Sequence, residues 1–322
     1  MSTTTTAIRA TLAIAYALQQ SINTIPVQLI KQITPKVSFD FLTQDLEISS
    51  LVKSKVIDGK TFSDEGVAPM ALGGLTEGVS PLELAAAYQI FGNGGYYNKP
   101  HSYTKVVNSK GEILLEHKQE PKRVLSAETA TIMNQLLQSV VKEGTGKQAD
   151  FGSMPLAGKT GTTSDNKDHW WAGMSPYYVG VGWFGYDTPY PINYRGTHPV
   201  MPVWKNVMSQ VHKGLDYKTF PFEGNVVRLE YCTETGKLAT DICTSTKMGY
   251  YNAADIPEKC TSHSGGSHTG VSSDVNSGTS SQQRPVPPPY IPTPSESSGA
   301  SSETSSQASS STDGNTSSEA AA

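Results

Sequence analysis

The sequence lacks a strong excess of charge of either sign. Its 322 residues include 25 Lys and Arg and 29 Asp and Glu, which gives a formal net charge of −4. Nucleic-acid-binding domains carry a basic patch or stripe, with aromatic side chains among the cations in many of them. The sequence contains no such stripe, so it does not indicate nucleic acid as a partner.

Long apolar runs are also missing. The longest apolar stretch lies near Leu12 to Leu18, and it is too short to cross a bilayer. Arg9 precedes this stretch and small residues lie within it, so a signal peptide is one interpretation. An amphipathic helix is the interpretation that we favour, and the chain would then carry no targeting information of its own.

The end of the chain has almost no apolar residues. From about Ser262 to Ala322, Ser, Thr, Gly and Pro dominate, and the stretch includes the Pro-rich run from Pro285 to Pro289. Such a segment cannot bury enough apolar surface to offset its chain entropy, so we predict a disordered, flexible tail. The folded part is expected to extend from about Ala7 to His263.

The remaining sequence predicts both helices and strands. Ser80, Pro81 and Glu83 form a strong helix start, because they suit the N-cap, the first helical position and the third. Further helices are expected over residues 7–33 in two pieces, over 126–141 and near 203–213, and a hairpin over 103–117. The order predicts an α+β fold with an antiparallel sheet covered by helices.

One expected strand carries Lys159, Thr160, Gly161 and Thr162. The lysine supplies an ammonium group, and the two threonine hydroxyls can hydrogen-bond a carboxylate. Gly161 removes a side chain where a substrate would lie against the backbone. The pattern suits recognition of an anion, although the triplet alone is also common at ordinary strand ends.

A second polar group, Ser21 and Asn23, lies at the break between the first two expected helices. Such residues commonly cap helix starts, since their side chains accept hydrogen bonds from free backbone N–H groups. From the sequence alone, capping is the better explanation. A functional role requires a partner motif elsewhere in the chain.

Taken together, these segments resemble the transpeptidase domain of bifunctional (class A) penicillin-binding proteins. The matching pieces are Ser21-Ile22-Asn23-Thr24, the block from Ala71 to Gly95, Gly144-Thr145-Gly146, Ala157 to Thr163, Asp168 to Gly173, Pro202-Val203-Trp204 and the end piece from Cys232 to His263. Ser-x-Asn and Lys-Thr-Gly are two of the three short motifs of these proteins and of serine β-lactamases. The resemblance covers nearly all of the folded part.

The third motif, Ser-x-x-Lys, does not precede Ser21. The strings that fit it begin at Ser50, Ser102, Ser139 and Ser164, all after Ser21, which reverses the order of the family. The resemblance implies that the serine of that motif attacks the D-Ala-D-Ala carbonyl of a cell-wall stem peptide, or a β-lactam. We therefore expect the chain to be the C-terminal part of a longer protein, with a fold that is incomplete at its N-terminus and exposes apolar surface there.

The resemblance also implies roles for the motif residues. Ser21 would relay protons as a catalytic residue, Asn23 would hold the substrate amide, and Lys159 would bias the local field. Thr160 and Thr162 would bind the terminal carboxylate beside Gly161, and the Thr162 N–H would supply half of an oxyanion hole.

The implied parent activity is peptidoglycan cross-linking by acyl transfer, without a cofactor, at the extracytoplasmic face of a bacterial membrane. Stem peptides, β-lactams and the missing N-terminal part would be the partners. Without its own nucleophile the chain is predicted to be inactive alone. The alternative is a binding module or pseudoenzyme that retains recognition of stem peptides.

The resemblance divides the chain into a partial transpeptidase domain at 1–222, a Cys-containing extension at 223–263 and the tail at 264–322. Cys232, Cys243 and Cys260 with His263 superficially suggest metal ligands, but their spacing is unlike a tight Cys-x-x-Cys knuckle, so no metal is expected. Outside a membrane a disulfide between Cys232 and Cys243 is an open alternative, which would leave Cys260 over.

Aromatic residues are concentrated between residues 170 and 184. They could form a platform for glycans, but alternation with glycine favours packing in core strands next to Lys159. The residues in question are Trp170, Trp171, Tyr177, Tyr178, Trp183 and Phe184.

Overall fold

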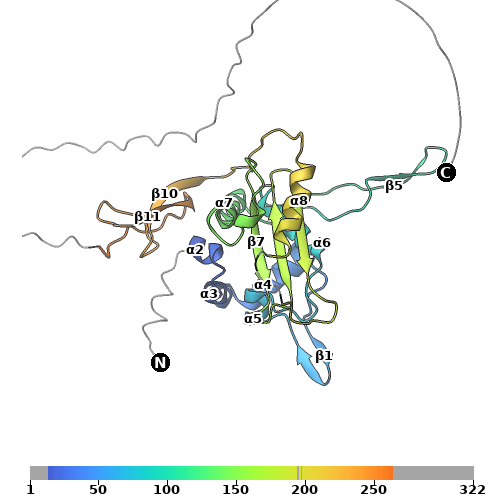
Figure 1. The fold of residues 1–322 in the computed structure, drawn as a ribbon, viewed down its shortest axis with the longest axis horizontal. Helices are drawn as coiled ribbons and strands as arrows, with labels where there is room; N and C mark the ends of the chain where they lie inside the picture. Colours follow the sequence, from blue (N-terminus) through green and yellow to red (C-terminus); the bar gives the residue numbers. More distant parts are fainter. Residues whose placement is uncertain (1–13, 194–195, 197, 264–322) are drawn as a thin grey trace, which may run out of the picture. The chain divides into compact units, whose positions relative to one another are not determined.

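The computed structural model describes residues 14–193, 196 and 198–263 (Figure 1). Its helices are α2 (Ile14–Gln19), α3 (Thr24–Ile33), α4 (Pro35–Asp40), the π-helix η1 (Phe41–Asp45), α5 (Val67–Leu72), α6 (Pro81–Tyr88), the 3₁₀ turn η2 (Gln89–Phe91), α7 (Ala127–Glu143), the 3₁₀ turn η3 (Lys147–Ala149) and α8 (Met201–Val211). Its strands are β1 (Lys55–Ile57), β2 (Lys60–Phe62), β3 (Tyr96–Tyr97), β4 (Lys105–Val107), β5 (Ile113–Glu116), β6 (Lys122–Arg123), β7 (Ala157–Thr162), β8 (His169–Met174), β9 (Val179–Phe184), β10 (Val226–Cys232) and β11 (Thr246–Asn252).

The central element is an antiparallel sheet in the order β7-β8-β9 (Figure 1). Lys159 of β7 lies opposite Ala172 of β8, which in turn lies opposite Val181 of β9. The strand predicted around Lys159 is therefore present, and the predicted α+β class is confirmed. Because β7 is at the edge of this sheet, the backbone groups on its outer side are not used by a neighbouring strand.

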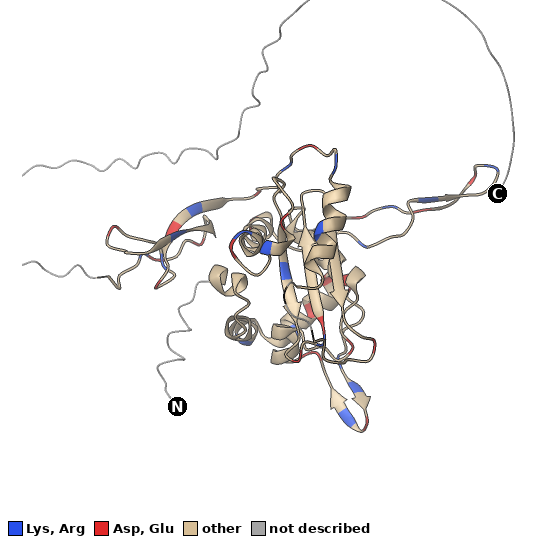
Figure 2. Ribbon diagram, in the orientation of Figure 1, with Lys and Arg blue, Asp and Glu red and all other residues tan. Residues whose placement is uncertain are grey.

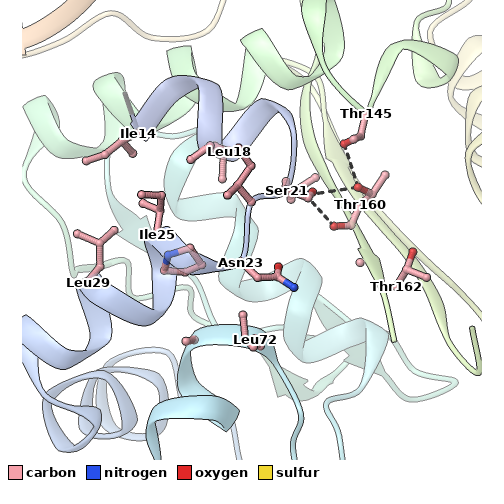
Figure 3. Close-up of a pocket in the computed structure, with 16 residues that line it drawn as sticks. Ile14, Leu18, Ser21, Asn23, Ile25, Leu29, Leu72, Thr145, Thr160 and Thr162 are labelled. Carbon is pink, nitrogen blue, oxygen red and sulfur yellow. Dashed lines mark hydrogen bonds between the residues drawn. The ribbon is translucent and has the colours of Figure 1, made fainter. Parts of the chain in front are cut away.

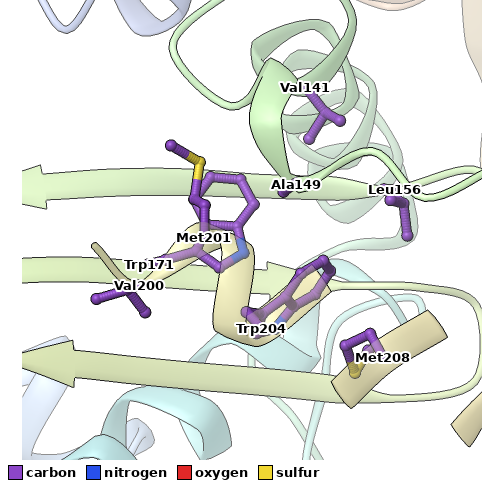
Figure 4. Close-up of a cluster of buried hydrophobic side chains, with 8 residues drawn as sticks. All are labelled: Val141, Ala149, Leu156, Trp171, Val200, Met201, Trp204 and Met208. Atoms are coloured by element: carbon purple, nitrogen blue, oxygen red, sulfur yellow. The ribbon is translucent and has the colours of Figure 1, made fainter. Parts of the chain in front are cut away.

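Helices pack against both faces of this sheet. Successive side chains of a strand point to opposite faces, so each strand contributes side chains to the packing on both sides. Trp171 belongs to a buried cluster with α8 that also includes the end of α7 (Figure 4). Ala157 and Met174 belong to a second cluster, which includes Leu137 of α7. The sheet is covered by helices as predicted.

The local signals for helix starts are confirmed. Ser80 and Glu83 form a reciprocal capping box at the start of α6, and Ser126 caps α7. The helix that starts at this cap becomes a 3₁₀ turn after Tyr88 and ends before the glycine pair at 94 and 95. Both glycines have positive φ, and a Cβ on Gly95 would meet the Leu125 carbonyl oxygen at 2.4 Å.

Glu83 also connects α6 to a distant loop. Its carboxylate accepts hydrogen bonds from the hydroxyls of Ser49 and Ser50, at 2.9 and 3.0 Å. Burial alone would raise the pKa of Glu83, but the hydrogen bonds from Ser80, Ser49 and Ser50 lower it to about 2. Glu83 is thus an ionised attachment point for the loop before β1.

The β4–β5 hairpin matches the prediction, except that its first strand begins at Lys105 and not at the start of the predicted range. The small β1–β2 and β3–β6 pairs were not predicted, because strands of two or three residues give too short a pattern to recognise. Residues 164–166 form a turn between β7 and β8, and Asn166 adopts a positive φ of 55°.

The prediction that all the aromatic residues from 170 to 184 pack in the core is wrong in part. Trp171 is 0% exposed, but Trp183 is 37% exposed, and Tyr178 and Phe184 are exposed as well. The reason is alternation on β9: a Cβ on Gly180 or Gly182 would collide with Trp204 or Val200, so these glycines face α8. Trp183 therefore points away from α8, and its Nε1 donates to Asp168 at 3.0 Å.

The C-terminal extension contains an antiparallel pair, β10 and β11, which was not predicted. The pair is joined to α7 by polar contacts, among them an ion pair of 3.3 Å between Lys247 and Glu143. Among the described residues, none of the helices combines the length and apolar character needed to cross a bilayer. The predicted tail at 264–322 and residues 7–13 of the first predicted helix lie outside the described residues. The proposed boundary at residue 222 stays a prediction.

Candidate active site

A groove of about 530 Å³ lies where β7 faces the helices α2, α3 and α5 (Figure 3). Its polar lining comes from Ser21, Asn23, Thr145, Lys159, Thr160 and Thr162, and Gly161 lies between the last two. Its apolar lining comes from Ile14, Ala17, Leu18, Ile22, Ile25, Pro26, Leu29, Ala71 and Leu72. All the site residues predicted from the sequence therefore line one groove.

Among the described residues that line the groove, Lys159 is the one that carries a charge. Elsewhere in the described part of the chain, basic and acidic positions are interspersed (Figure 2). A cation without an acidic neighbour in the lining gives the groove a positive potential, which favours an anionic ligand.

The junction between α2 and α3 presents Ser21 and Asn23 to β7. Ser21 adopts a positive φ of 53°, which is uncommon for a residue other than glycine and is found at functional turns. Asn23 occupies the N-cap of α3, but its side chain makes no capping hydrogen bond. The capping interpretation is therefore wrong for Asn23, and its amide is directed to the groove (Figure 3).

The Lys159 ammonium joins the two motifs. Its Nζ donates to Ser21 Oγ, and also to the Thr160 carbonyl oxygen at 3.0 Å. Burial lowers the pKa of Lys159 to about 8, because removal from water disfavours the charged form. A lysine with this pKa can both give and accept a proton near neutral pH, and Ser21 is in direct contact with it.

The loop after α7 positions the serine and the strand together. The Thr145 backbone N–H donates to the Gln19 carbonyl oxygen at the end of α2, at 3.1 Å. Its hydroxyl pairs with that of Thr160 at 3.0 Å. A Cβ on Gly144 would lie 2.5 Å from the Gln19 oxygen, and one on Gly146 would lie 2.9 Å from the Trp171 ring. The two glycines are required by these close approaches.

Thr145 is the groove residue that the sequence reasoning missed. Gly144-Thr145-Gly146 was recognised as a segment of the resemblance, but its threonine was given no role. The sequence did carry a signal for it: a glycine on each side of one hydroxyl residue indicates that the backbone there packs closely against another segment.

Gly161 has a second reason to be glycine besides substrate access. A Cβ there would lie 3.2 Å from the Trp170 side chain on the neighbouring strand. Thr162, the last residue of β7, is exposed at the mouth of the groove. Its hydroxyl is thus accessible to a ligand at the end of β7.

The Ser-x-x-Lys strings after Ser21 contribute no serine to the groove lining. Ser50 Oγ donates to Glu83, and Ser139 Oγ donates to the Leu136 carbonyl oxygen of its own helix at 2.6 Å. Both hydroxyls have structural partners, in agreement with the view that these strings are chance matches.

The cysteines lie away from the groove, in the extension, and none of the three forms a disulfide. Their thiol groups and a ring nitrogen of His263 all lie within 4.8 Å of one another. The spacing argument against a metal site is therefore not valid, because segments distant in the sequence bring the four groups together.

The family described as the penicillin binding protein transpeptidase domain matches residues 2–208, more than half of the chain. The chain is 36% identical over 228 residues to penicillin-binding protein 1A of Clostridium botulinum strain Langeland, which covers 70% of this chain and 26% of that protein. It thus spans about a quarter of that relative's length.

Two solved structures share the fold. Penicillin-binding protein 1A from Haemophilus influenzae superposes with a TM-score of 0.63 at 21% identity, over 76% of this chain and 40% of the other. The PonA1 protein from Mycobacterium tuberculosis, solved in complex with penicillin V, gives a TM-score of 0.52 at 23% identity, over 65% and 58%. With the residues of the groove and the family match, these likenesses lead to one conclusion: the chain belongs to the transpeptidase domain family of penicillin-binding proteins, close to its class A members.

Proposed function

We propose that the groove beside β7 binds the D-Ala-D-Ala end of peptidoglycan stem peptides, and β-lactams in their place. The observation that carries this proposal is the convergence of Lys159, Thr160 and Thr162 with Ser21 and Asn23 on one groove. A terminal carboxylate would be held by the two threonine hydroxyls in the field of the ammonium. The outer edge of β7, which no strand of the sheet pairs with, and the Asn23 amide would hydrogen-bond the peptide groups of the ligand.

The proposed parent activity is D,D-transpeptidation, which cross-links peptidoglycan at the outer face of a bacterial membrane. In that reaction a serine oxygen attacks the penultimate carbonyl carbon, its proton leaves with the released D-Ala amine, and the acyl group forms an ester. An amine of a second stem peptide then attacks the ester and regenerates the serine hydroxyl. The Ser21 hydroxyl and Lys159 ammonium would carry the proton to the leaving amine.

This chain would supply the binding and proton-transfer groups of that reaction. No Ser-x-x-Lys precedes Ser21 in the sequence, and Ser21 is the one serine among the described residues of the groove lining. We therefore expect reversible ligand binding by the chain alone, without a stable acyl-enzyme. That PonA1 was solved with penicillin V supports a β-lactam as the probe.

The test combines a fluorescent penicillin with a binding measurement on the purified chain. We expect no covalent band on a denaturing gel, together with ligand-observed NMR signals for an N-acyl-D-Ala-D-Ala peptide. The peptide with L-Ala-L-Ala is the matched control ligand. A covalent band that disappears in Ser21→Ala would identify Ser21 as a nucleophile and overturn the division of roles proposed here.

Thr162→Ala tests the carboxylate contact directly. Loss of one hydrogen bond to a charged group costs about 1.5–3 kcal/mol, so the affinity should fall by roughly 10-fold or more. Thr61→Ala, at an exposed position of β2, is the control and should bind normally. Equal affinity in both variants would refute the assigned role of Thr162.

A further experiment separates an incomplete enzyme from a binding module. A segment that carries Ser-x-x-Lys, taken from a transpeptidase of the same family, is added to the chain before the penicillin. Covalent labelling in the mixture, above that of the segment alone, supports the transpeptidase. Peptide binding that persists without such labelling supports the binding module.

A further inference from the structure

Three separate segments of the extension meet at one point. Cys232 is the last residue of β10, Cys243 lies in the loop before β11, and Cys260 and His263 follow β11. Their sulfur atoms and a histidine ring nitrogen all lie within 4.8 Å of one another. The convergence uses every cysteine of the chain.

The distances suit a small tetrahedral ion. With Zn–S bonds of about 2.3 Å and a Zn–N bond of about 2.0 Å, neighbouring ligand atoms of a tetrahedron lie roughly 3.5–3.8 Å apart. Cys232 Sγ and His263 Nε2 are 3.1 Å apart. Side-chain adjustments of well under 1 Å would therefore be enough to surround an ion.

Hydrogen bonds to the sulfur atoms hold two of the cysteines in place. The Thr240 backbone N–H donates to Cys243 Sγ at 3.3 Å, and the Thr235 hydroxyl donates to Cys260 Sγ at 3.3 Å. Donors of this kind orient metal-bound thiolates and stabilise their negative charge.

The backbone around Cys232 folds back tightly on itself. The Gly236 N–H donates to the Cys232 carbonyl oxygen, and the Cys232 N–H donates to the Lys237 carbonyl oxygen, both at 2.8 Å. Gly236 adopts a positive φ of 73°, which glycine permits. The Cys260 N–H donates to the Leu238 carbonyl oxygen at 2.8 Å, so the last segment is fixed to the same loop.

The extension has little other means of holding its shape. Its buried apolar side chains, within residues 223–263, are Tyr231, Cys232 and Cys260, and none of its residues belongs to the three buried clusters of the described chain. A two-stranded hairpin is marginally stable in water, and small units of this kind commonly require a metal or disulfides. A disulfide would use two of the three cysteines and leave the third as a free thiol.

We propose that Cys232, Cys243, Cys260 and His263 bind one Zn²⁺ ion that holds the extension together. Three thiolates and an imidazole form a donor set that Zn²⁺ prefers over Mg²⁺ or Ca²⁺, and four protein ligands close the coordination sphere. Cys232 and Cys260 are buried, at 0% and 4% exposure. The site is accordingly structural and has no position for a substrate.

The test measures metal in the full chain, purified under reducing conditions and dialysed against metal-free buffer. Elemental analysis and native mass spectrometry should both find about one zinc per chain. Cys243→Ser and His263→Ala should lose most of it. His101→Ala, which removes an exposed histidine of another segment, is the matched control and should retain the zinc.

Replacement of zinc by Co²⁺ in the wild-type chain identifies the kind of ligand from its spectrum, and two histidine variants then test one ligand. Tetrahedral cobalt with thiolate ligands should give strong visible bands and thiolate charge-transfer bands, which His263→Ala should alter and His101→Ala should not. A wild-type chain that retains no metal, or that has a mass reduced by disulfide formation under the reducing conditions, would overturn the proposal.

Discussion

The groove beside β7 and the cysteine cluster of the extension both gather polar groups from distant segments, but they direct them differently. In the groove, the hydroxyls of Ser21, Thr145 and Thr162 are exposed, and Lys159 has no acidic partner in the lining. In the cluster, the sulfur atoms of Cys232 and Cys260 are buried and turned toward one another. An open set of groups suits a ligand that comes and goes, whereas a closed set suits an ion that stays.

The two regions also differ in what supports them. The groove lies beside a sheet whose two faces are covered by helices. Trp171 of β8 is part of a buried cluster on one of these faces. The extension has a hairpin with few buried apolar side chains. Its stability should therefore depend on the ion, and the stability of the groove on packing.

Removal of the metal should have the largest effect. Structural zinc contributes about 10–16 kcal/mol of apparent binding free energy in zinc-finger peptides, which far exceeds what a small hairpin contributes. A strong chelator should therefore remove hydrogen-exchange protection from residues 226–252, while protection in β7 and β8 persists. Unchanged hydrogen-exchange protection of β10 and β11 in chelated, metal-free protein would show that the stability of the extension does not depend on an ion.

Trp171→Ala should have the next largest effect, in the other region. Loss of a fully buried tryptophan costs about 3–5 kcal/mol, through lost burial and the cavity left behind. Urea unfolding followed on β7 and β8 should show this loss, while the metal content stays the same. Trp183→Ala is the control, since its ring is 37% exposed, and should cost about 1 kcal/mol or less. A loss in Trp171→Ala as small as that expected for Trp183→Ala would show that the sheet does not depend on this cluster.

Lys159→Met should weaken ligand binding without weakening the fold at neutral pH. Loss of a charged partner for the ligand carboxylate costs about 1.5–3 kcal/mol, so the affinity for the D-Ala-D-Ala peptide should fall by at least 10-fold. Lys205→Met, at an exposed position of α8, is the control and should bind normally.

The pH dependence of this lysine has a definite sign. The folded pKa of about 8 lies below the unfolded value of 10.5, so the unfolded state binds more protons between these values. The wild type should therefore gain stability relative to Lys159→Met as the pH rises from 8 to 10.5. Thermal unfolding at pH 7 and pH 10 measures this, and a relative loss of stability of the wild type between these two pH values would show instead that the fold favours the charged form.

Substitution of Glu83 should give the smallest change in unfolding free energy, and the extension should not be affected. Its folded pKa of about 2 lies below the unfolded value of 4.5, so its contribution is full above pH 4.5 and is lost as the pH falls through 2. Because the carboxylate is partly solvated, Glu83→Gln should cost about 1 kcal/mol at pH 7 and less at pH 2. Acid titration of the unfolding free energy measures it, with Glu116→Gln, on exposed β5, as the control. A loss in Glu83→Gln that does not change with pH would exclude the carboxylate as its cause.

Local signals in the sequence predicted much of the fold. The Ser80 cap, the helix after Ser126, the β4–β5 hairpin and the strand around Lys159 each depend on a few neighbouring residues. The β10–β11 pair was missed although Val227, Leu229 and Tyr231 alternate with polar residues in β10, because its partner β11 has no such alternation. Trp183 was misplaced because the sequence does not say which face of β9 packs against α8.

For the site, the sequence by itself determined the chemical groups and, through the resemblance, the family. Only the tertiary structure decided which groups meet. Lys159 donates to Ser21 from 138 positions away, and Cys232 reaches His263 from 31 positions away. Helix and strand patterns report neighbours within a few residues, whereas such contacts depend on how the elements pack. That packing made Ser21 a partner of Lys159, and it turned an unremarkable cysteine spacing into four converging ligands.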